Sequence, residues 1–455
     1  MHKDRYLGTD PQSLPLAREL YDTMRAYPII SPHGHVDPLL LLENKPFTNP
    51  VELLITPDHY LTRMLMSQGI GLEQLQGDPL EAWKLFAENW KLFRSTPSRI
   101  WMHEIFSSLF DIYELLTPES AEHIYQRINE RLTEPDFTPQ ALFKRFDIEV
   151  LATTDATSQP LDTHAQLATL DLGGRVIPTF RPDDVSDPER ADWRNSIDSL
   201  AAATGESCDS FAGFLEALRI RRKYFKDHGA TATDHGVLNP QTLNLAKNDK
   251  EKLFKQLLSG QIEPETSATF RAVMLLEHAR MASDDGLVMQ LHPGSLRDYS
   301  SGIASLYGKD KGFDIPVTTT YVRELRALLE EVGFHPNFRM VIFTLDESVY
   351  SRELAPLAGA YPSIRLGPPW WFHDSLNGME RWRDAITETA GFYNTVGFID
   401  DTRAFCSIPV RHDVARRFDA GYLSREVSRH RLTKEEALEV AGDIAYKLSK
   451  DFFNL

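Results

Sequence analysis

Eight short apolar or β-branched runs alternate with helical patterns along this chain and predict an α/β fold, a (β/α)8 TIM barrel. Each run ends in polar or charged residues, and the carboxyl ends of barrel strands are where chemistry collects. A long helical stretch after the first run predicts a large, mostly helical insertion after the first strand. The runs are residues 27–30, 148–154, 175–180, 229–233, 287–291, 340–345, 363–366 and 395–399.

The order of these runs favours a parallel sheet. Helical periodicity separates many of them, as in residues 271–282 and 322–332. Strands that alternate with helices pair in parallel, and eight such units are expected to close into a barrel. An open, doubly wound sheet is the alternative, because runs 229–233 and 363–366 are the least strand-like. A capping box formed by Thr433 and Glu436 predicts a final helix.

The insertion, residues 36–147, contains an aromatic stripe at helical spacing. We interpret this stripe as core packing rather than a ligand-binding surface. An insertion after a barrel strand projects over the active-site face, where it can act as a lid or a wall. We therefore expect three parts: residues 1–35 with the first strand, 36–147 over the active site, and 148–455 with the remaining barrel and C-terminal helix. The stripe comprises Trp83, Phe86, Trp90 and Phe93.

Composition limits the classes of partner. The 455 residues include 49 Lys and Arg against 66 Asp and Glu, a net charge of −17, which disfavours binding to nucleic acid or anionic membranes. No apolar run approaches the ~18 residues that cross a bilayer. Two cysteines cannot build a disulfide framework, so we expect a cytoplasmic protein. We also expect a homo-oligomer, although no motif marks its interface. An acidic protein that binds an acidic ligand must concentrate arginines locally, so their positions are informative.

His33-Gly34-His35 is the sharpest chemical signal. Side chains two residues apart on a strand face the same way, about 6.6 Å apart along the chain. Two imidazoles so placed can converge on one divalent metal, for which histidine is a preferred ligand. An isolated pair of this kind is more often two surface histidines in a turn. Its place at the end of the first strand favours the metal-ligand interpretation.

Asp401-Thr402-Arg403 is the second signal, at the end of the last run. In a closed barrel the last strand pairs with the first, so Asp401 can approach the two histidines and complete a three-ligand site. Three protein ligands leave a position open for a substrate oxygen. The competing carboxylate, Asp400, points the other way by the period-two rule. The alternative for Asp401 and Arg403 is an ordinary ion pair.

Four further strand-end side chains are candidates for the pocket. His292 can bind metal or substrate, or be a satisfied core histidine. Arg181 and Arg297 can hold a carboxylate through paired hydrogen bonds, or be solvated or ion-paired. Trp371, next to Trp370, can form an apolar wall or belong to the core.

Seven segments in chain order resemble the motifs of the uronate (glucuronate) isomerases, a branch of the amidohydrolase superfamily. They span nearly the full chain, and together they are highly specific although each alone is weak. The segments are 31–38 (SPHGHVDP), 58–60 (DHY), 179–183 (TFRPD), 290–297 (QLHPGSLR), 370–372 (WWF), 378–381 (GMER) and 401–403 (DTR).

The resemblance implies an aldose–ketose isomerase that converts D-glucuronate to D-fructuronate and D-galacturonate to D-tagaturonate. It implies one divalent metal, commonly zinc, bound by His33, His35 and Asp401. It also implies that the insertion places side chains in the site. The implied substrate contacts are Arg181, His292, Arg297 and Arg403, and the implied insertion residues are His59 and Tyr60.

Such an isomerisation moves the C2 proton to C1 through an enediolate, which a metal or Arg403 can stabilise. Asp401 or an ionised Tyr60 can serve as the base, and we favour Asp401 because ionising a tyrosine at neutral pH needs a large pKa shift. Hydride transfer is the rival chemistry, and it would more naturally use a second metal. The sequence offers no second ligand set.

Two other function classes are weighed against the isomerase. A mononuclear metal-dependent hydrolase of the amidohydrolase type is the first, since most relatives with a His-x-His barrel site hydrolyse amides or esters. Residues 344–347 carry no histidine, which favours a single metal. A non-catalytic, metal-bound scaffold is the second class. Turnover assays with uronates and with amides separate all three.

Overall fold

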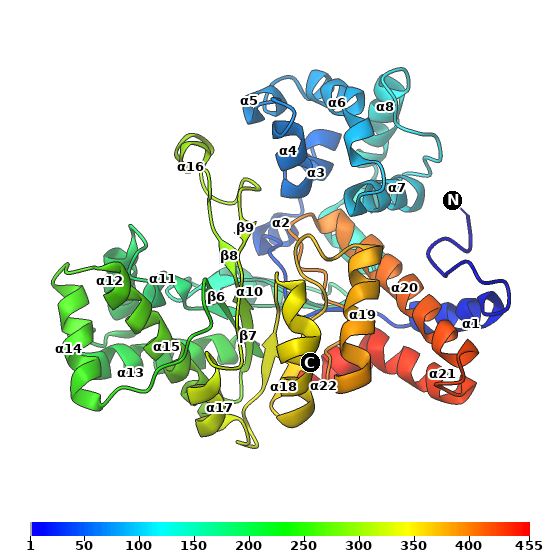
Figure 1. Cartoon of the computed structure of the whole chain (residues 1–455). Helices are drawn as coiled ribbons and strands as arrows, with labels where there is room; N and C mark the ends of the chain where they lie inside the picture. The colour runs from blue at the N-terminus through cyan, green and yellow to red at the C-terminus, as the bar shows by residue number, and fades with distance from the viewer. Residues whose placement is uncertain (1) are drawn as a thin grey trace.

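The computed structural model describes residues 2–455, and its short parallel strands lie near the centre of the molecule, among the helices (Figure 1). The predicted segment 1–35 begins at Met1, which lies outside the described residues. The central strands are β1 (Ile29–Ser31), β2 (Ile148–Ala152), β3 (Asp155–Ala156), β4 (Arg175–Ile177), β5 (Phe180–Arg181), β6 (Ala232–Val237), β7 (Val288–Pro293), β10 (Met340–Ile342) and β11 (Ile364–Leu366).

The strands pair in parallel and follow chain order. One ladder runs β1-β2-β4 and the other β11-β10-β7-β6-β5-β3. They are parts of one sheet, because β3 continues β2 after two residues and β5 continues β4 in the same way. A parallel bridge from Leu366 to Thr395 adds an eighth segment. The backbone N–H of His35 donates to the carbonyl of Thr402 at 3.0 Å, which joins the first and last segments as a (β/α)8 barrel requires.

Two of the eight predicted strands differ from the structure. Run 395–399 forms only the single bridge, because Gly397 adopts a left-handed φ of 75° with the carbonyl of Ile444 packed against it. Run 229–233 is displaced to β6, and Gly229 lies before that strand with a φ of 93°. Asp234 and His235 therefore lie within a strand rather than beyond it. Buried polar side chains inside a strand resemble a strand end in the sequence.

Helices surround the barrel and account for most of the other residues after β2. The predicted final helix is α21, and its capping box at Thr433 and Glu436 is confirmed. The helices outside the insertion are α1 (Leu14–Arg25), α10 (Asp162–Leu167), α11 (Asp183–Ser186), α12 (Trp193–Thr204), α13 (Phe211–Asp227), α14 (Lys247–Leu258), α15 (Pro264–Asp285), α16 (Ser301–Tyr307), α17 (Arg326–Val332), α18 (Ala355–Ala360), α19 (Leu376–Ala390), α20 (Ile408–Ser428), α21 (Lys434–Gly442) and α22 (Leu448–Phe453).

The insertion is helical, and its described residues contain no strand. Trp83, Phe86, Trp90 and Phe93 are all buried in its core, as predicted for packing residues. Helices α3 to α8 gather on one side of the barrel (Figure 1). The insertion helices are α2 (Pro38–Glu43), α3 (Pro50–Leu54), α4 (His59–Met66), α5 (Leu72–Leu75), α6 (Pro79–Glu88), α7 (Pro97–Leu109), α8 (Ala121–Leu132) and α9 (Pro139–Arg145).

An arm that the sequence did not predict extends beside the insertion (Figure 1). It comprises residues 295–316, with β8 (Ser295–Leu296) and β9 (Ile315–Pro316) paired antiparallel and α16 between them. The hydroxyl of Tyr307 donates to Glu73 and ties the arm to the insertion. Among residues 2–455, no helix is long and apolar enough to cross a bilayer.

Candidate active site

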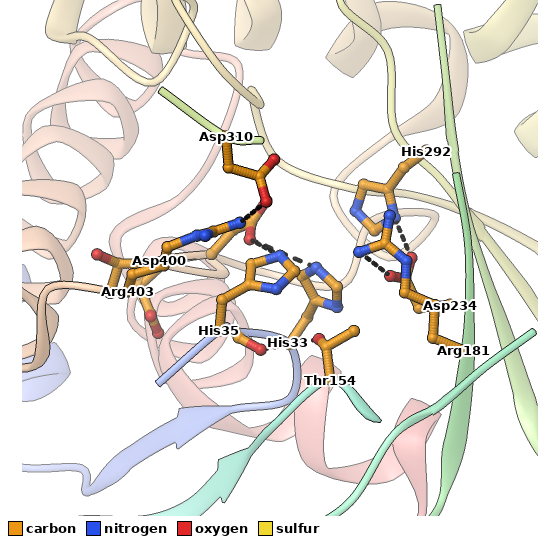
Figure 2. Close-up of polar contacts among 12 residues, drawn as sticks. His33, His35, Thr154, Arg181, Asp234, His292, Asp310, Asp400 and Arg403 are labelled. Carbon is orange, nitrogen blue, oxygen red and sulfur yellow. Dashed lines mark hydrogen bonds and ion pairs between the residues drawn. The ribbon is translucent and has the colours of Figure 1, made fainter. Parts of the chain in front are cut away.

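His33, His35 and Asp401 converge where the first and last barrel segments meet, and Figure 2 shows the two histidines side by side. The Nε2 atoms of His33 and His35 lie 3.4 and 3.2 Å from the same oxygen of Asp401. The carboxylate of Asp400 instead faces His412 on α20, at 3.0 Å. The structure thus brings the three predicted ligands together and turns the competing aspartate away. Two imidazole nitrogens that share one buried carboxylate oxygen form a donor set that fits a divalent cation.

His292, at the end of β7, lies on the other side of His33. Their ring centroids are 4.6 Å apart, and Nδ1 of His292 lies 2.7 Å from Asp234. The Nε2 atom of His292 is buried without a hydrogen-bond partner among the described residues. His33, Asp234 and His292 form a second group close enough to hold a metal. However, Asp234 also lies 3.3 Å from a guanidinium nitrogen of Arg181, so its charge is already compensated.

Three predicted arginines border the same cavity of about 350 Å³ as the histidines. Each guanidinium contacts at least one carboxylate, which matches the ion-paired alternative for Arg181 and Arg297. The Nε atom of Arg403 is buried without a hydrogen-bond partner among the described residues. The pairs are Arg181–Asp183 at 2.8 Å, Arg297–Asp314 at 2.7 Å and Arg403–Asp310 at 2.9 Å.

The insertion contributes His59 and Tyr60 from the first turn of α4. This helix begins at His59 because the Asp58 side chain accepts a hydrogen bond from the backbone N–H of Tyr60. The ring of His59 meets the edge of Trp371, with centroids 5.5 Å apart. The Tyr60 hydroxyl donates to Asp374 at 3.0 Å and is directed at that buried carboxylate.

Trp370 and Trp371 both line the cavity. The guanidinium of Arg297 lies 4.9 Å from the centre of the Trp371 ring. Trp370 is buried, stacks on Trp371 and contacts the ring of His292.

The surroundings of the ionisable groups in the site shift their pKa values in different directions. Burial alone would raise the pKa of Asp401, but the charges and hydrogen bonds of His33 and His35 hold it well below its usual value. Burial, together with the charge of Arg403, lowers the pKa of His59 to about 4. Burial, with the charge of Asp374, raises the pKa of Tyr60 well above its usual value.

Sequence reasoning missed three acidic residues of the site. The sequence predicts Asp234 beyond the end of a strand, whereas it lies within β6. Asp310 lies on the arm that the sequence does not predict. Asp374 follows the tryptophan pair in a segment from which nothing was inferred. Burial raises its pKa to about 6, while Arg411 donates to it at 3.1 Å. One sequence signal could have indicated such residues: arginines that cluster in a site require carboxylates nearby to balance their charge.

Comparison with known proteins identifies the family of this chain. A family model described as glucuronate isomerase matches residues 6–453. The chain belongs to the glucuronate isomerase family. Curated relatives support the assignment: the uronate isomerases of Phenylobacterium zucineum and Xanthomonas euvesicatoria are each 49% identical to it. The alignments cover 100% of this chain in both cases, with 97% and 98% of those proteins.

Solved structures of the family share the fold. The glucuronate isomerase from Caulobacter crescentus superposes with a TM-score of 0.98 at 47% identity, over 100% of this chain and 97% of that one. The uronate isomerase from Thermotoga maritima gives a TM-score of 0.94 at 28% identity, over 100% of both chains. The family resemblance and the barrel fold predicted from the sequence are confirmed.

Several buried histidines predict that the isomerase fold is sensitive to acid. Burial lowers the pKa of His235 to about 3 and of His164 to about 4, and it holds His278 well below its usual value. These groups are neutral when folded and bind protons near pH 6.5 when unfolded. Their stabilisation is therefore complete above pH 6.5 and is lost as the pH falls toward 4. Each costs about 1.4 kcal/mol per pH unit in that window.

Urea denaturation at several pH values measures this effect. His278→Gln should reduce the number of protons taken up on unfolding between pH 5 and 6 by about one. The difference between the variant and the unmodified protein gives the contribution of His278 alone to the pH dependence of stability. Buried carboxyl groups with raised pKa values, such as Asp155 at about 6, change stability with pH in the opposite direction and are the same in both proteins. An unchanged pH dependence in the variant would contradict the assignment.

Proposed function

We propose that this family member is a metal-dependent aldose–ketose isomerase that interconverts D-glucuronate and D-fructuronate, and D-galacturonate and D-tagaturonate. One observation carries the proposal: three arginines border the cavity that also contains the two-histidine, one-aspartate group. Guanidinium groups suit the carboxylate of a sugar acid, whereas the protein as a whole carries a net charge of −17. The curated relatives named uronate isomerase support the same substrate class.

The proposed cofactor is one divalent metal, zinc, held by His33, His35 and Asp401. Two imidazoles and a carboxylate are ligands that zinc prefers, and three protein ligands leave a position for substrate. When bound, such a metal acts as a Lewis acid on a substrate oxygen. The positive charge of Arg181 lies beside Asp234 in the second possible ligand group, which supports one bound metal ion rather than two.

We propose that the C2 proton is lifted and returned to C1 by a carboxylate, while a proton moves from O2 to O1. The ionised state of Asp401 supports its role as this base, although its low pKa makes it a weak one. The hydroxyl of Tyr60 is committed to Asp374 and stays protonated, so Tyr60 fits better as a fixed donor than as an ionised base. Arg403, with its unpaired buried Nε, stabilises the enediolate. His292 and Trp371 line the substrate pocket.

The deciding experiment is a turnover assay with a panel of uronates and simple amides, using metal-stripped and metal-restored protein. The proposal expects uronate turnover that is lost on stripping and recovered with Zn²⁺. Amide hydrolysis without isomerisation would identify a mononuclear hydrolase of the amidohydrolase type instead. Metal binding without any turnover would identify a scaffold.

Arg181 and Arg297 are the proposed clamp for the substrate carboxylate. Replacing either with glutamine should cost about 1.5–3 kcal/mol, which lowers kcat/KM by about tenfold to a hundredfold, mainly through KM. Arg194→Gln is the control, because Arg194 is half exposed on α12 and pairs with Asp198. A change below about threefold in both cavity variants would place the clamp elsewhere.

Isomerisation in deuterated water tests the proton route. We expect solvent deuterium at C1 of the product, because a carboxylate base exchanges its proton with water. Hydride transfer would be favoured instead by a primary isotope effect from C2-deuterated substrate together with no exchange of hydrogen with the solvent. Both results would have to be the same in the Asp401→Asn and Tyr60→Phe variants as in the unmodified protein. Product NMR and the two variants together separate the routes.

We also propose a cytoplasmic homo-oligomer with no nucleic-acid or membrane partner. Both cysteines, Cys208 and Cys406, are free, as expected in a reducing compartment. Exposed Tyr299, Leu306 and Ile315 gather on the arm and supply apolar surface for self-association. Light scattering after gel filtration measures the subunit count, and a monomer would refute this proposal.

A further inference from the structure

A second cavity, of about 300 Å³, lies at the end of the barrel opposite the catalytic groups. Arg339 lines it just before β10 begins, and Arg365 lines it from β11. Phe343, just after β10, instead contacts His292 of the active site, with ring centroids 4.1 Å apart. Because the strands are parallel, their amino ends form the opposite face of the barrel. The cavity is therefore separate from the proposed active site.

Arg365 occupies an unusual position for a charged residue. It pairs in register with Val341 of β10, so the two side chains share a face of the sheet. Val341 packs with Val288 and Phe453 inside the barrel. Arg365 is therefore directed toward the interior of the barrel at its amino end, where a side chain is usually apolar.

Neither arginine is neutralised by a carboxylate in the part of the chain that the structure describes. Arg339 donates only through Nη1, to two main-chain carbonyls and to Asn454. Arg365 likewise donates only through Nη1, to the carbonyls of Pro362 and Ile364. Burial and the nearby charge of Arg339 lower the pKa of Arg365. Two half-buried like charges without a counter-charge repel each other, and an anion between them would replace that repulsion by attraction.

The rest of the lining fits a small anion with an organic body. Both guanidiniums lie over the ring of Phe452, at 6.0 and 5.3 Å from its centre, and exposed Lys447 adds a third cation. Asp443 also lines the cavity, but it already accepts from Tyr393 at 2.9 Å and lies 4.0 Å from Lys447. Asp451 is exposed at the rim and contacts neither guanidinium through its carboxylate.

We propose that this cavity is an anion site that binds a phosphoryl group, from free phosphate or from a small phosphate ester. A phosphoryl group offers three terminal oxygens and a charge of up to about −2 to two planar guanidiniums, whereas a carboxylate offers two oxygens and a single charge. The ring of Phe452 provides an apolar surface for the body of an ester. The proposal does not depend on the isomerase activity.

Isothermal titration of the metal-loaded full chain with inorganic phosphate, and separately with a hexose 6-phosphate, tests the site. We expect saturable binding that Arg365→Gln weakens more than about tenfold. Arg326→Gln on α17 is the matched control, because Arg326 is exposed and paired with Glu330. Lys447→Gln removes an exposed lining charge without disturbing the core, and it should weaken binding several-fold. All three variants should keep the turnover of the unmodified protein.

The proposed active site also binds an anionic substrate, so Arg297→Gln serves as a second variant that tests for phosphate binding there. Binding that survives Arg297→Gln but not Arg365→Gln supports the proposal. Equal affinity for both probes assigns the site to phosphate itself, and tighter binding of the ester assigns it to an ester that contacts Phe452. Binding lost only in Arg297→Gln, no saturable heat in the unmodified protein, or a preference for D-glucuronate at this site would overturn it.

Discussion

Asp401→Asn is expected to lower kcat/KM for D-glucuronate by about 10²- to 10³-fold and to reduce bound metal at the same time. The carboxylate oxygen of Asp401 is shared by His33 and His35 at 3.4 and 3.2 Å, so the amide removes the charge at the centre of the group. Asparagine keeps the shape of the side chain, and the loss therefore reports charge and basicity rather than packing. Metal content by elemental analysis and steady-state kinetics give the two readouts.

The neighbouring carboxylate provides the control for this variant. Asp400 is even less exposed than Asp401, with 1% against 10% of its side chain accessible, but it pairs with His412, away from the metal group. Asp400→Asn should therefore keep its metal content, even if it lowers the free energy of unfolding. Full activity and full metal content in Asp401→Asn would remove Asp401 from the site. Equal metal loss in both variants would point to a general structural effect.

The barrel was predictable because its pattern is local and repeated. Parallel strands buried on both faces are short apolar runs, and helical periodicity separates them. His33 and His35 could be placed because two residues at the end of one strand share a face. Asp401 needed one long-range inference, that the last segment of a closed barrel adjoins the first. The hydrogen bond from His35 to Thr402 realises that contact, although the segment before it is not a regular strand.

The missed partners depend on contacts that no local pattern encodes. Asp310 reaches Arg403 from a different loop, across 93 positions of the chain. Asp374 reaches Tyr60 across 314 positions, from a turn that follows the tryptophan pair. Each is an aspartate in an irregular segment, and the sequence contains many of those. Their pairing follows from the need of a partly buried guanidinium and a buried tyrosine hydroxyl for a polar partner. That need identifies the type of partner but not its position in the sequence.

Arg403→Gln is the second change with a large expected effect, a loss of about 10²- to 10³-fold in kcat with little change in KM. The guanidinium borders the cavity beside His35 and Asp401, and its buried Nε has no partner among residues 2–455. A cation placed there stabilises the charge that develops on the enediolate oxygens more than it stabilises the neutral sugar carbonyl. The loss should therefore affect the reaction step more than substrate binding.

Asp310→Asn separates this role from the ion pair that Arg403 forms. The pair has an N–O distance of 2.9 Å, and Arg403 helps to hold the pKa of Asp310 down at about 2 against the effect of burial. Removing the Asp310 charge leaves the guanidinium in place, so kcat should fall much less than in Arg403→Gln. Arg381→Gln, at an exposed arginine on α19 that pairs with Glu347, controls for the loss of a surface cation. If Arg403→Gln raises KM as much as it lowers kcat/KM, then Arg403 binds the ground-state sugar and the enediolate must be stabilised by other groups.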